Sequence, residues 1–345
     1  MEKILAIDIG YGETKGQFEG KNFTFRSGFA PYRKGDVPMG SSYGISIHAT
    51  LTHQDGRVEE KNLGPFIVGD ISMLYPNFTE PVGNERLGTD NALVLLGEAL
   101  LRAGVYGDVI LSTGAPLDLF SSERENARRW KGLNITVTST NGKKLFARIV
   151  DIVTQPQGVA AAVALEELNL LPKTFGIAVV IDIGAKTTDV VSIALTKDNM
   201  DAIRPLCFSI PVGVGDLFNR IGEGISKDLG GFRPQRGLIQ AALGRETFSH
   251  SGKTCNLAPI EQEARESTIL ALSNEIRRRF GEQIGLVISI AVVGGGAKDF
   301  LLGRVVDGLF PGAEIIPIDS AVAPYMNAAG YYCQANKIVS EPVSI

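Results

Sequence analysis

Short apolar runs that end in a glycine turn recur at widely separated places along this chain. The run 4–7 leads into Asp8-Ile9-Gly10-Tyr11-Gly12-Glu13-Thr14-Lys15, and the run 177–181 leads into Asp182-Ile183-Gly184-Ala185-Lys186-Thr187-Thr188-Asp189. Each run is rich in β-branched residues and is followed by a second extended segment, so each predicts a β-hairpin with glycine in its turn. A third apolar run, 286–291, leads into the glycines at 294–296.

The rest of the pattern alternates strands with helices, in two halves that resemble each other in outline. Residues 109–114 are predicted to be a strand of the buried type, and residues 145–153 a further strand. The predicted helices are 91–103, 121–131, 159–168, 217–229, 234–243, 260–279 and 324–332. Strands that alternate with helices indicate an α/β protein, and the repeated order of hairpin, strands, glycine turn and helix indicates a weak internal duplication.

The two repeated turns have the residue types that bind phosphate. A tight turn of glycine and small hydroxyl residues exposes backbone N–H groups that wrap phosphate oxygens. We expect those N–H groups at Gly10, Tyr11, Gly12, Gly184 and Ala185, and side-chain donors at Thr14, Lys15, Thr187 and Thr188. Lys186 is either a further contact or a solvated side chain. One such turn alone is as readily a plain hairpin, but two copies and a third glycine element favour a nucleotide held between two lobes.

The aspartate before each turn is a candidate ligand for a metal ion. Asp8 and Asp182 would approach one magnesium ion from opposite lobes, mostly through its water molecules, because Mg²⁺ loses water reluctantly. Hydrolysis of a bound nucleotide also needs an acceptor that orients the attacking water. Gln157 or Gln155, in the turn before a helix, is placed to supply one. An amide orients a water but is a poor base, which implies slow hydrolysis. The plainer alternative is that this turn only caps the helix.

The remaining candidates concern the nucleoside. Gly213, Gly215 and Asp216, with Arg220 and Glu223 on the helix that follows, would hold the ribose and base, or else form a helix start and its solvated face. The third element, Gly294, Gly295 and Gly296 followed by Lys298, has a clearer rationale. A residue without Cβ lets the backbone approach an adenine ring closely.

Composition narrows the compartment and the partners. The chain has 345 residues, 44% of them hydrophobic and 21% charged, and a formal net charge of −4, which argues against direct attraction to nucleic acid or to an anionic membrane. No apolar stretch approaches the roughly 20 residues that span a bilayer. Cys207, Cys255 and Cys333 lack the spacing of metal ligands. We therefore expect a cytoplasmic protein whose link to DNA, if it has one, runs through another protein.

Taken together, the motifs resemble the ATPase superfamily of actin, sugar kinases and heat-shock chaperones, over nearly the whole chain. The finer pattern is similar to prokaryotic actin-like proteins of the ParM type and to archaeal actin-like proteins. The motifs that carry this resemblance are Ile7-Asp8-Ile9-Gly10-Tyr11-Gly12, Ser112-Thr113-Gly114-Ala115-Pro116-Leu117, Pro156-Gln157-Gly158-Val159, Val180-Ile181-Asp182-Ile183-Gly184, Gly213-Val214-Gly215-Asp216 and Met326-Asn327-Ala328-Ala329-Gly330-Tyr331.

The resemblance implies an actin-like two-lobe fold with duplicated five-stranded mixed sheets, flanking helices and a cleft that holds ATP or ADP with Mg²⁺. Lobe I would comprise 1–157 and 320–345, and lobe II 158–319. It further implies polar filaments whose assembly is coupled to hydrolysis and, in plasmid-encoded members, a DNA-bound adaptor that links the filament to plasmid DNA for segregation. Many members carry glutamate where this chain has Gln157, which affects the expected rate of hydrolysis.

Two other functions are compatible with the same fold. A small-molecule kinase would need a catalytic aspartate on the cleft floor, and the glutamines at 155 and 157 disfavour it. A nucleotide switch that does not polymerise would keep the fold without the filaments. Assembly in the presence of nucleotide distinguishes these alternatives.

Overall fold

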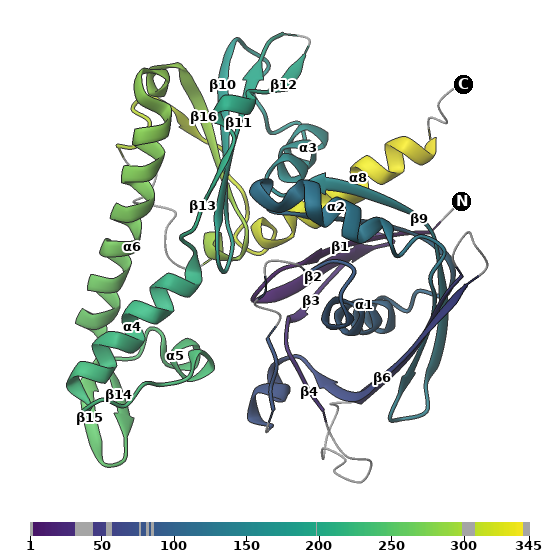
Figure 1. The fold of residues 1–345 in the computed structure, drawn as a ribbon. Helices are drawn as coiled ribbons and strands as arrows, with labels where there is room; N and C mark the ends of the chain where they lie inside the picture. Colours follow the sequence, from purple (N-terminus) through teal and green to yellow (C-terminus); the bar gives the residue numbers. More distant parts are fainter. Residues whose placement is uncertain are drawn as a thin grey trace. The chain divides into compact units, whose positions relative to one another are not determined.

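The computed structural model describes residues 3–31, 44–52, 57–75, 77–80, 83, 86–197, 199–298 and 308–340. The chain divides into two compact units (Figure 1): unit 1 comprises Met1–Leu170 and Tyr325–Ile345, and unit 2 comprises Leu171–Pro324. The side chain of Lys298, one of the predicted nucleotide contacts, falls outside the described part. Among the described helices, none is both long and apolar enough to cross a membrane.

Unit 1 is built on a mixed sheet that has nine strands among the described residues, in the order β3-β2-β1-β7-β9-β8-β5-β6-β4. The strands are β1 (Lys3–Ile9), β2 (Glu13–Phe18), β3 (Lys21–Arg26), β4 (Phe29–Pro31), β5 (Gly44–Thr52), β6 (Val58–Val68), β7 (Gly107–Ala115), β8 (Asn134–Ser139) and β9 (Lys144–Pro156). β1 pairs antiparallel with β2 and parallel with β7, and β7 pairs parallel with β9.

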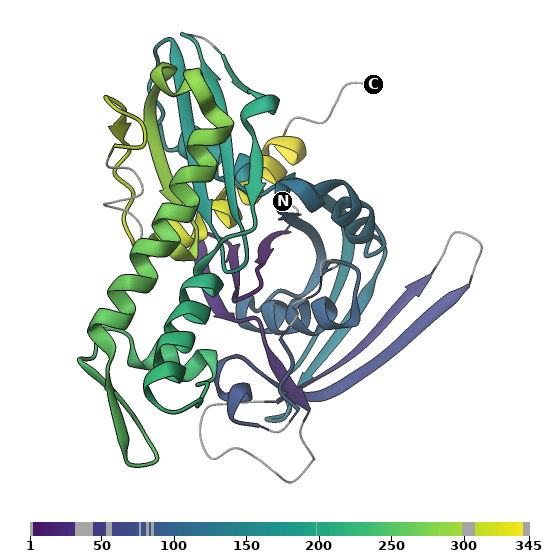
Figure 2. The same ribbon diagram turned by 60° about the vertical axis from the view of Figure 1, so that its left-hand side comes forward.

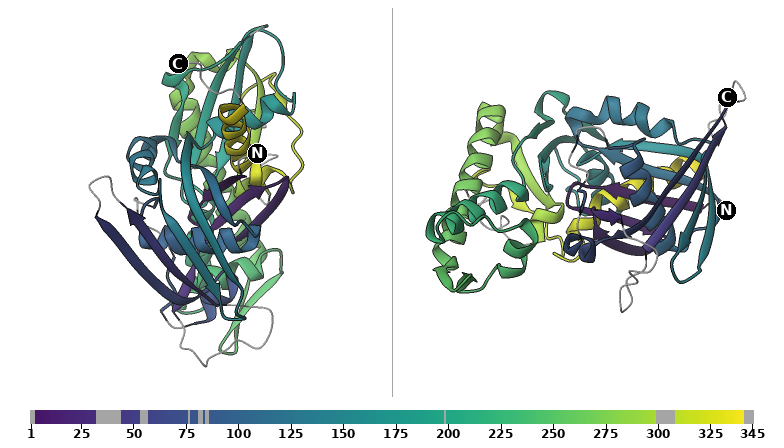
Figure 3. Two further views of the ribbon diagram at one scale, coloured as in Figure 1. Left: turned by 90° about the vertical axis from the view of Figure 1, so that its right-hand side faces the viewer. Right: turned by 60° about the horizontal axis from the view of Figure 1, so that its bottom comes forward.

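Helices cover both faces of this sheet, because side chains alternate between the faces along each strand. Leu5, Ile7 and Ile9 of β1 share a core with α1 (Asp90–Ala103), around which the sheet curls (Figures 2 and 3). Ala6 of β1 instead packs with residues of α3 (Val159–Glu167) and α8 (Met326–Ser340). The smaller helices are α2 (Phe120–Arg128), η1 (Asp70–Leu74) and η2 (Leu117–Leu119).

Unit 2 has a sheet in the order β12-β11-β10-β16-β17, with β13 also paired to β11, as far as the described residues go. Its elements are β10 (Gly176–Ile183), β11 (Thr188–Leu195), β12 (Met200–Ala202), η3 (Arg204–Leu206), β13 (Phe208–Ile210), α4 (Val214–Asp228), α5 (Arg236–Ala242), β14 (Thr247–His250), β15 (Lys253–Asn256), α6 (Leu257–Phe280), η4 (Gly281–Leu286), β16 (Val287–Val293), η5 (Gly295–Lys298), β17 (Glu314–Ile315) and η6 (Ala323–Tyr325). The C-terminal half of α6 packs on the sheet, and its N-terminal half packs with α4, α5 and β15.

The two sheets contain the same five-stranded arrangement, which confirms the predicted duplication. In β3-β2-β1-β7-β9 and in β12-β11-β10-β16-β17, three antiparallel strands are followed by two that continue in parallel. Unit 1 extends the arrangement by β8, β5, β6 and β4, which the sequence interpretation did not foresee. The extension starts on β9, whose residues from Lys144 to Arg148 pair with β8.

Candidate functional site

The two repeated motifs fold into equivalent turns, one in each unit. The N–H of Gly10 donates to the carbonyl of Glu13 over 3.2 Å, and the N–H of Gly184 donates to the carbonyl of Thr187 over 2.9 Å. A Cβ at either glycine would lie less than 3.0 Å from that same carbonyl oxygen, so the turn closes only around glycine. These two N–H groups are therefore used inside the turns. Of the five predicted cradle donors, Gly10 and Gly184 thus use their N–H groups to close the turns.

The side chains after the first turn lie on β2, on the sheet itself. Thr14 is fully buried, and its hydroxyl is hydrogen-bonded to Oγ of Ser27 over 2.8 Å. Lys15 lies directly opposite Asp8 in the antiparallel pair, which places the two side chains on the same face. The Lys15 ammonium is 3.8 Å from the Glu13 carboxylate. Lys15 is therefore the cation next to the aspartate of the first turn.

The second turn has the opposite charge at the corresponding position. Asp182 lies directly opposite Asp189, and both side chains are buried. Ser209 donates a short hydrogen bond to Asp189. Thr188, the counterpart of Thr14, donates its hydroxyl hydrogen to the carbonyl of Val212 over 2.8 Å. Thr187 supplies the carbonyl that closes the turn, and Lys186 is exposed. Two buried carboxylates on one face attract a cation.

Gln157 and Asp8 meet in unit 1, although 149 positions separate them in sequence. Nε2 of Gln157 donates to Oδ1 of Asp8 over 2.7 Å, and both side chains are buried. The N-cap residue of α3 is Gly158, and the amide nitrogen of Gln157 is bonded to Asp8 instead of to this helix. Gly158 instead donates its N–H to Oδ1 of Asn327 on α8 over 2.9 Å. Gln155 points elsewhere: its Oε1 is buried without a hydrogen-bond partner among the described residues.

The glycines at the start of α4 pack against the second turn. The N–H groups of Val214 and Gly215 donate to the carbonyls of Gly184 and Ala185 over 3.0 and 2.7 Å. A Cβ at Gly213 or Gly215 would lie 2.7 Å from one of these carbonyl oxygens. Asp216 accepts the N–H of Gly213 over 2.8 Å, as in a capping box. These residues form the start of α4, and their contact with a ribose or base stays a prediction.

Arg220 and Glu223 point in different directions from α4. Arg220 donates to Oγ of Ser267 on α6 over 2.8 Å, at the surface. Glu223 lines a pocket of about 340 Å³ within unit 2, which is also lined by Phe218 and Arg236. The guanidinium of Arg236 stacks on the Phe218 ring at 5.0 Å. Glu223 is therefore next to a pocket with an aromatic wall, whereas Arg220 joins two helices.

The third glycine element packs on the end of β10. Gly294 has a φ of 85°, and a Cβ there would lie 2.3 Å from Oδ1 of Asp182. A Cβ at Gly296 would lie 2.3 Å from Cγ2 of Ile183. At these two positions glycine is required by the close approach of the protein itself, and an approach to an adenine ring stays a prediction. Gly295, between them, is partly exposed.

Arg86 is a residue of this region that the sequence interpretation missed. Its Nη1 donates to the carbonyl of Ile9 over 2.7 Å, and its guanidinium stacks on the ring of Tyr11 at 4.4 Å. A single arginine ahead of a predicted helix carries no sequence signal that would associate it with a turn 77 positions earlier in the chain. Among the described residues, no group of three or more His, Cys, Asp or Glu side chains is arranged to hold a metal ion by itself.

Comparison with known proteins assigns both halves of the chain to related families. Residues 6–159 match the family model for the N-terminal domain of actin-like proteins. Residues 180–302 match the family model for the C-terminal part of MreB-like archaeal actin homologues. An archaeal actin homolog of Thermoplasma volcanium is 28% identical over 335 residues, which cover 95% of this chain and 97% of that protein.

Solved structures agree with this assignment. A crystal structure of an archaeal actin homolog in complex with ADP has a TM-score of 0.79 and 28% identity, and the match covers 97% of this chain and 99% of that one. A 15-stranded ParM filament from Clostridium botulinum has a TM-score of 0.75 at 18% identity, with 97% and 99% covered, and shows a likeness of fold. With its duplicated sheets and turns, the chain belongs to the actin-like ATPase superfamily.

Proposed function

We propose that this protein binds ATP with Mg²⁺, hydrolyses it slowly and assembles into polar filaments. The observation that carries the proposal is the bond between Gln157 and Asp8 beside a glycine turn that unit 2 repeats at Asp182. A similar protein was crystallised with ADP, which supports a nucleotide as the ligand. In this proposal one nucleotide contacts both turns through its phosphates, and the pocket beside Glu223 is a candidate for part of the nucleoside.

The residues present fit a magnesium ion. Asp182 and Asp189 place two buried carboxylates on one face of unit 2, and carboxylate oxygens are preferred ligands of Mg²⁺. Because no larger cluster of ligands is found among the described residues, the ion would be completed by phosphate oxygens and water. When bound, Mg²⁺ would neutralise charge on the phosphates.

The chain's own groups would position the reactants. The amide nitrogen of Gln157 is committed to Asp8, so its Oε1 is the end that would accept a hydrogen bond from water. An amide holds the water in place without removing its proton, which suits slow turnover. Lys15, opposite Asp8, would add a positive charge near the phosphates.

Assembly would follow from the nucleotide state. A nucleotide that contacts both units favours one arrangement of them only if it binds that arrangement better, and loss of the γ-phosphate removes part of that preference. A head-to-tail contact between copies does not close on itself, so it gives open filaments. The ParM filament of similar fold supports this mode of assembly.

We also propose a cytoplasmic location and DNA as the cargo. Because the chain has a net charge of −4, which does not attract DNA, the DNA would be bound through an adaptor protein.

Light scattering and sedimentation across a concentration series, with ATP, GTP, ADP or a non-hydrolysable ATP analogue plus Mg²⁺, test the proposal. We expect a critical concentration with ATP and slower disassembly with the analogue. A chain that binds nucleotide but stays monomeric at high concentration would be a nucleotide switch. Consumption of ATP that depends on an added sugar would instead identify a kinase.

A further inference from the structure

Arg86 brings a buried positive charge to the first glycine turn. Its side chain is about as buried as the hydrophobic core, with 3% of the residue exposed. Nη1 donates to the carbonyl of Ile9, and the guanidinium stacks on Tyr11, so the arginine contacts the turn on both sides of Gly10. The guanidinium is thus placed at the turn that we propose holds phosphate.

The backbone that carries Arg86 is fixed. The carboxylate of Glu123, which is itself fully buried, accepts the N–H groups of Arg86 and Leu87 at distances of 2.8 to 3.1 Å. Thr89 donates its hydroxyl hydrogen to the Arg86 carbonyl over 2.6 Å and also caps α1. The side chain therefore starts from a rigid position and has little freedom to find another partner.

One edge of this guanidinium has no partner. Among the described residues, Nε and Nη2 of Arg86 are buried without a hydrogen-bond acceptor, and the side chain forms no ion pair. Nε carries one hydrogen and Nη2 carries two, so three N–H donors are unused. Burial of a charge without a counter-charge or hydrogen bonds is unfavourable.

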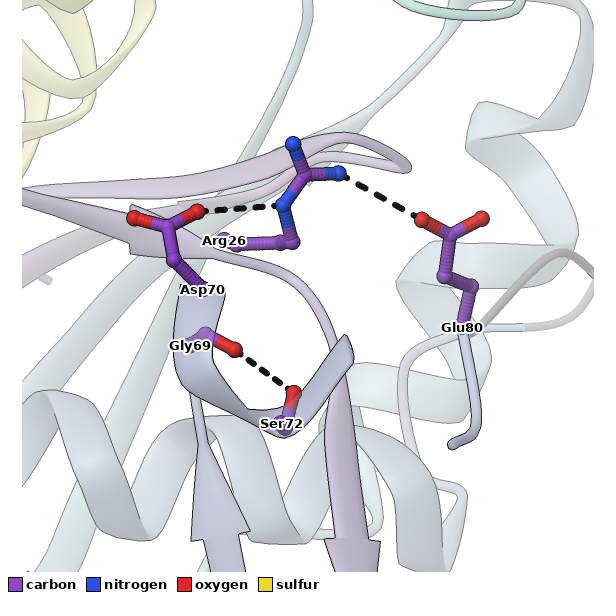
Figure 4. Close-up of polar contacts among 5 residues, drawn as sticks. All are labelled: Arg26, Gly69, Asp70, Ser72 and Glu80. Atoms are coloured by element: carbon purple, nitrogen blue, oxygen red, sulfur yellow. Dashed lines mark hydrogen bonds and ion pairs between the residues drawn. The ribbon is translucent and has the colours of Figure 1, made fainter. Parts of the chain in front are cut away.

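Two other arginines of unit 1, Arg26 on β3 and Arg102 on α1, have carboxylate partners. Arg26, also buried, bonds through Nε to Asp70 over 3.1 Å and through Nη1 to Glu80 over 3.5 Å (Figure 4). Arg102 stacks on a phenylalanine ring and bonds to Glu98 over 2.6 Å. Each has a carboxylate partner, whereas Arg86 has none among the described residues.

Elsewhere in this chain, arginines use the same edge, formed by Nε and Nη2, to bind carboxylates. Arg148 uses Nε and Nη2 together to hold both oxygens of Asp108, and Arg278 uses the same pair of atoms on Glu275. This edge offers two parallel N–H donors, which match two oxygens of a carboxylate or a phosphate. At Arg86 the protein supplies no such anion from the described residues.

We propose that Arg86 binds a phosphate group of the nucleotide directly, through Nε and Nη2. The inference rests on the proposed nucleotide binding and adds to it a cationic ligand for the phosphates on the side of unit 1. The ring of Tyr11 holds the guanidinium in plane, and the carbonyl of Ile9 occupies Nη1, so the donor edge is pre-organised. The chemistry that Arg86 would recognise is the phosphate, whatever base is attached.

Calorimetric titration of ATP, ADP, inorganic pyrophosphate and adenosine into the wild-type chain and its Arg86→Lys and Arg86→Gln variants tests the inference. We expect both variants to bind ATP, ADP and pyrophosphate at least about tenfold more weakly, because lysine keeps the charge but loses the two-donor edge. Binding of adenosine should not change. Arg102→Gln is the matched control, since Arg102 also stacks on an aromatic ring and donates to a backbone carbonyl, and it should bind ATP as the wild type does.

The outcomes separate the two proposals. Wild-type protein that binds no nucleotide would overturn the proposed function. Wild-type binding with unchanged affinity in Arg86→Lys and Arg86→Gln would overturn only the role of Arg86, and so would an equal loss for adenosine, which contains no phosphate. If Arg86→Gln does not fold, as judged by circular dichroism, Arg86→Lys is assessed by the rise in melting temperature that pyrophosphate causes. The inference requires that rise in the wild type and its loss in the variant.

Discussion

The side-chain amide of Gln157 donates its Nε2 hydrogen to Oδ1 of Asp8 over 2.7 Å. The bond joins the end of β9 to the end of β1, and it orients the amide by committing its nitrogen end. The oxygen end is then the only acceptor that this side chain has to offer a water molecule. The contact thus links the aspartate of the first turn with the residue proposed to position the attacking water.

Replacement of Gln157 by alanine should slow hydrolysis far more than it weakens binding. The water would lose its acceptor in the transition state, while the phosphate contacts of the ground state would remain, so we expect kcat to fall about a hundredfold at nearly constant nucleotide affinity. Phosphate release under single-turnover conditions measures the first quantity, and calorimetry the second. Gln155→Ala is the control. A large loss in Gln155→Ala with a silent Gln157→Ala would assign the role to Gln155.

Replacement of Asp182 by alanine should abolish the benefit of magnesium for ATP binding. Asp182 and Asp189 together attract the cation, and removal of one carboxylate leaves the ion a weaker site. We expect ATP affinity in magnesium buffer to fall at least about tenfold, with little change in EDTA. Wild-type affinity of the variant in both buffers would show that Asp182 does not serve the metal.

Gly330→Ala should destabilise unit 1. A Cβ at Gly330 would lie 1.7 Å from the carbonyl oxygen of Ala160, so α8 would have to move away from α3. We expect a loss of about 2 kcal/mol or more in the free energy of unfolding, measured with urea. Gly285→Ala, where a Cβ meets nothing within 4 Å, should change stability by less than about 0.5 kcal/mol. Equal effects of the two substitutions would contradict the tight helix contact.

The buried carboxyl of Glu98 should make stability depend on pH. Burial in α1 raises the pKa of Glu98 above its usual 4.5, although Arg102 opposes the shift. The folded state then binds more protons than the unfolded state, so this contribution to stability is full below the unfolded pKa and is lost as pH rises through the folded pKa. From about pH 4 to about pH 7, stability relative to Glu98→Gln should fall by on the order of 1 kcal/mol.

The measurement is urea unfolding of both proteins across that range of pH. Glutamine keeps an acceptor for Arg102 and does not titrate, so the difference between the two proteins isolates the carboxyl group. A difference that stays constant with pH, or one that grows in favour of the wild type as pH rises, would contradict the direction of the pKa shift.

Sequence alone predicted the features that depend on local pattern. Apolar runs followed by glycine located both turns, and the order of strands and helices gave the duplicated sheets. The sequence assigned Asp8 and Gln157 to the same nucleotide site, but it did not predict the hydrogen bond between them. The nucleotide contacts and the lobe boundaries after residues 157 and 319 stay predictions.

Contacts between distant segments could not be predicted in this way. Gly294 and Gly213 are glycine because β10 and the second turn pass close to them, and this depends on packing that no local pattern encodes. Arg86 is informative only once its unpaired edge is known. The four added strands of unit 1 depend on where β9 finds its second partner, and alternation of polar and apolar residues does not specify a partner.

The helix pair α3 and α8 also determines how unit 2 is tethered. Gly158 bonds Asn327 at the start of both helices, and Lys337 pairs with Glu167 at their ends, so the two helices run parallel. The chain leaves unit 1 just after α3 ends and returns just before α8 begins, so the two tethers are attached at opposite ends of the pair, on the order of 13 Å apart along it. The two connections to unit 2 are therefore attached to the helix pair at separate ends of it and not at a single point.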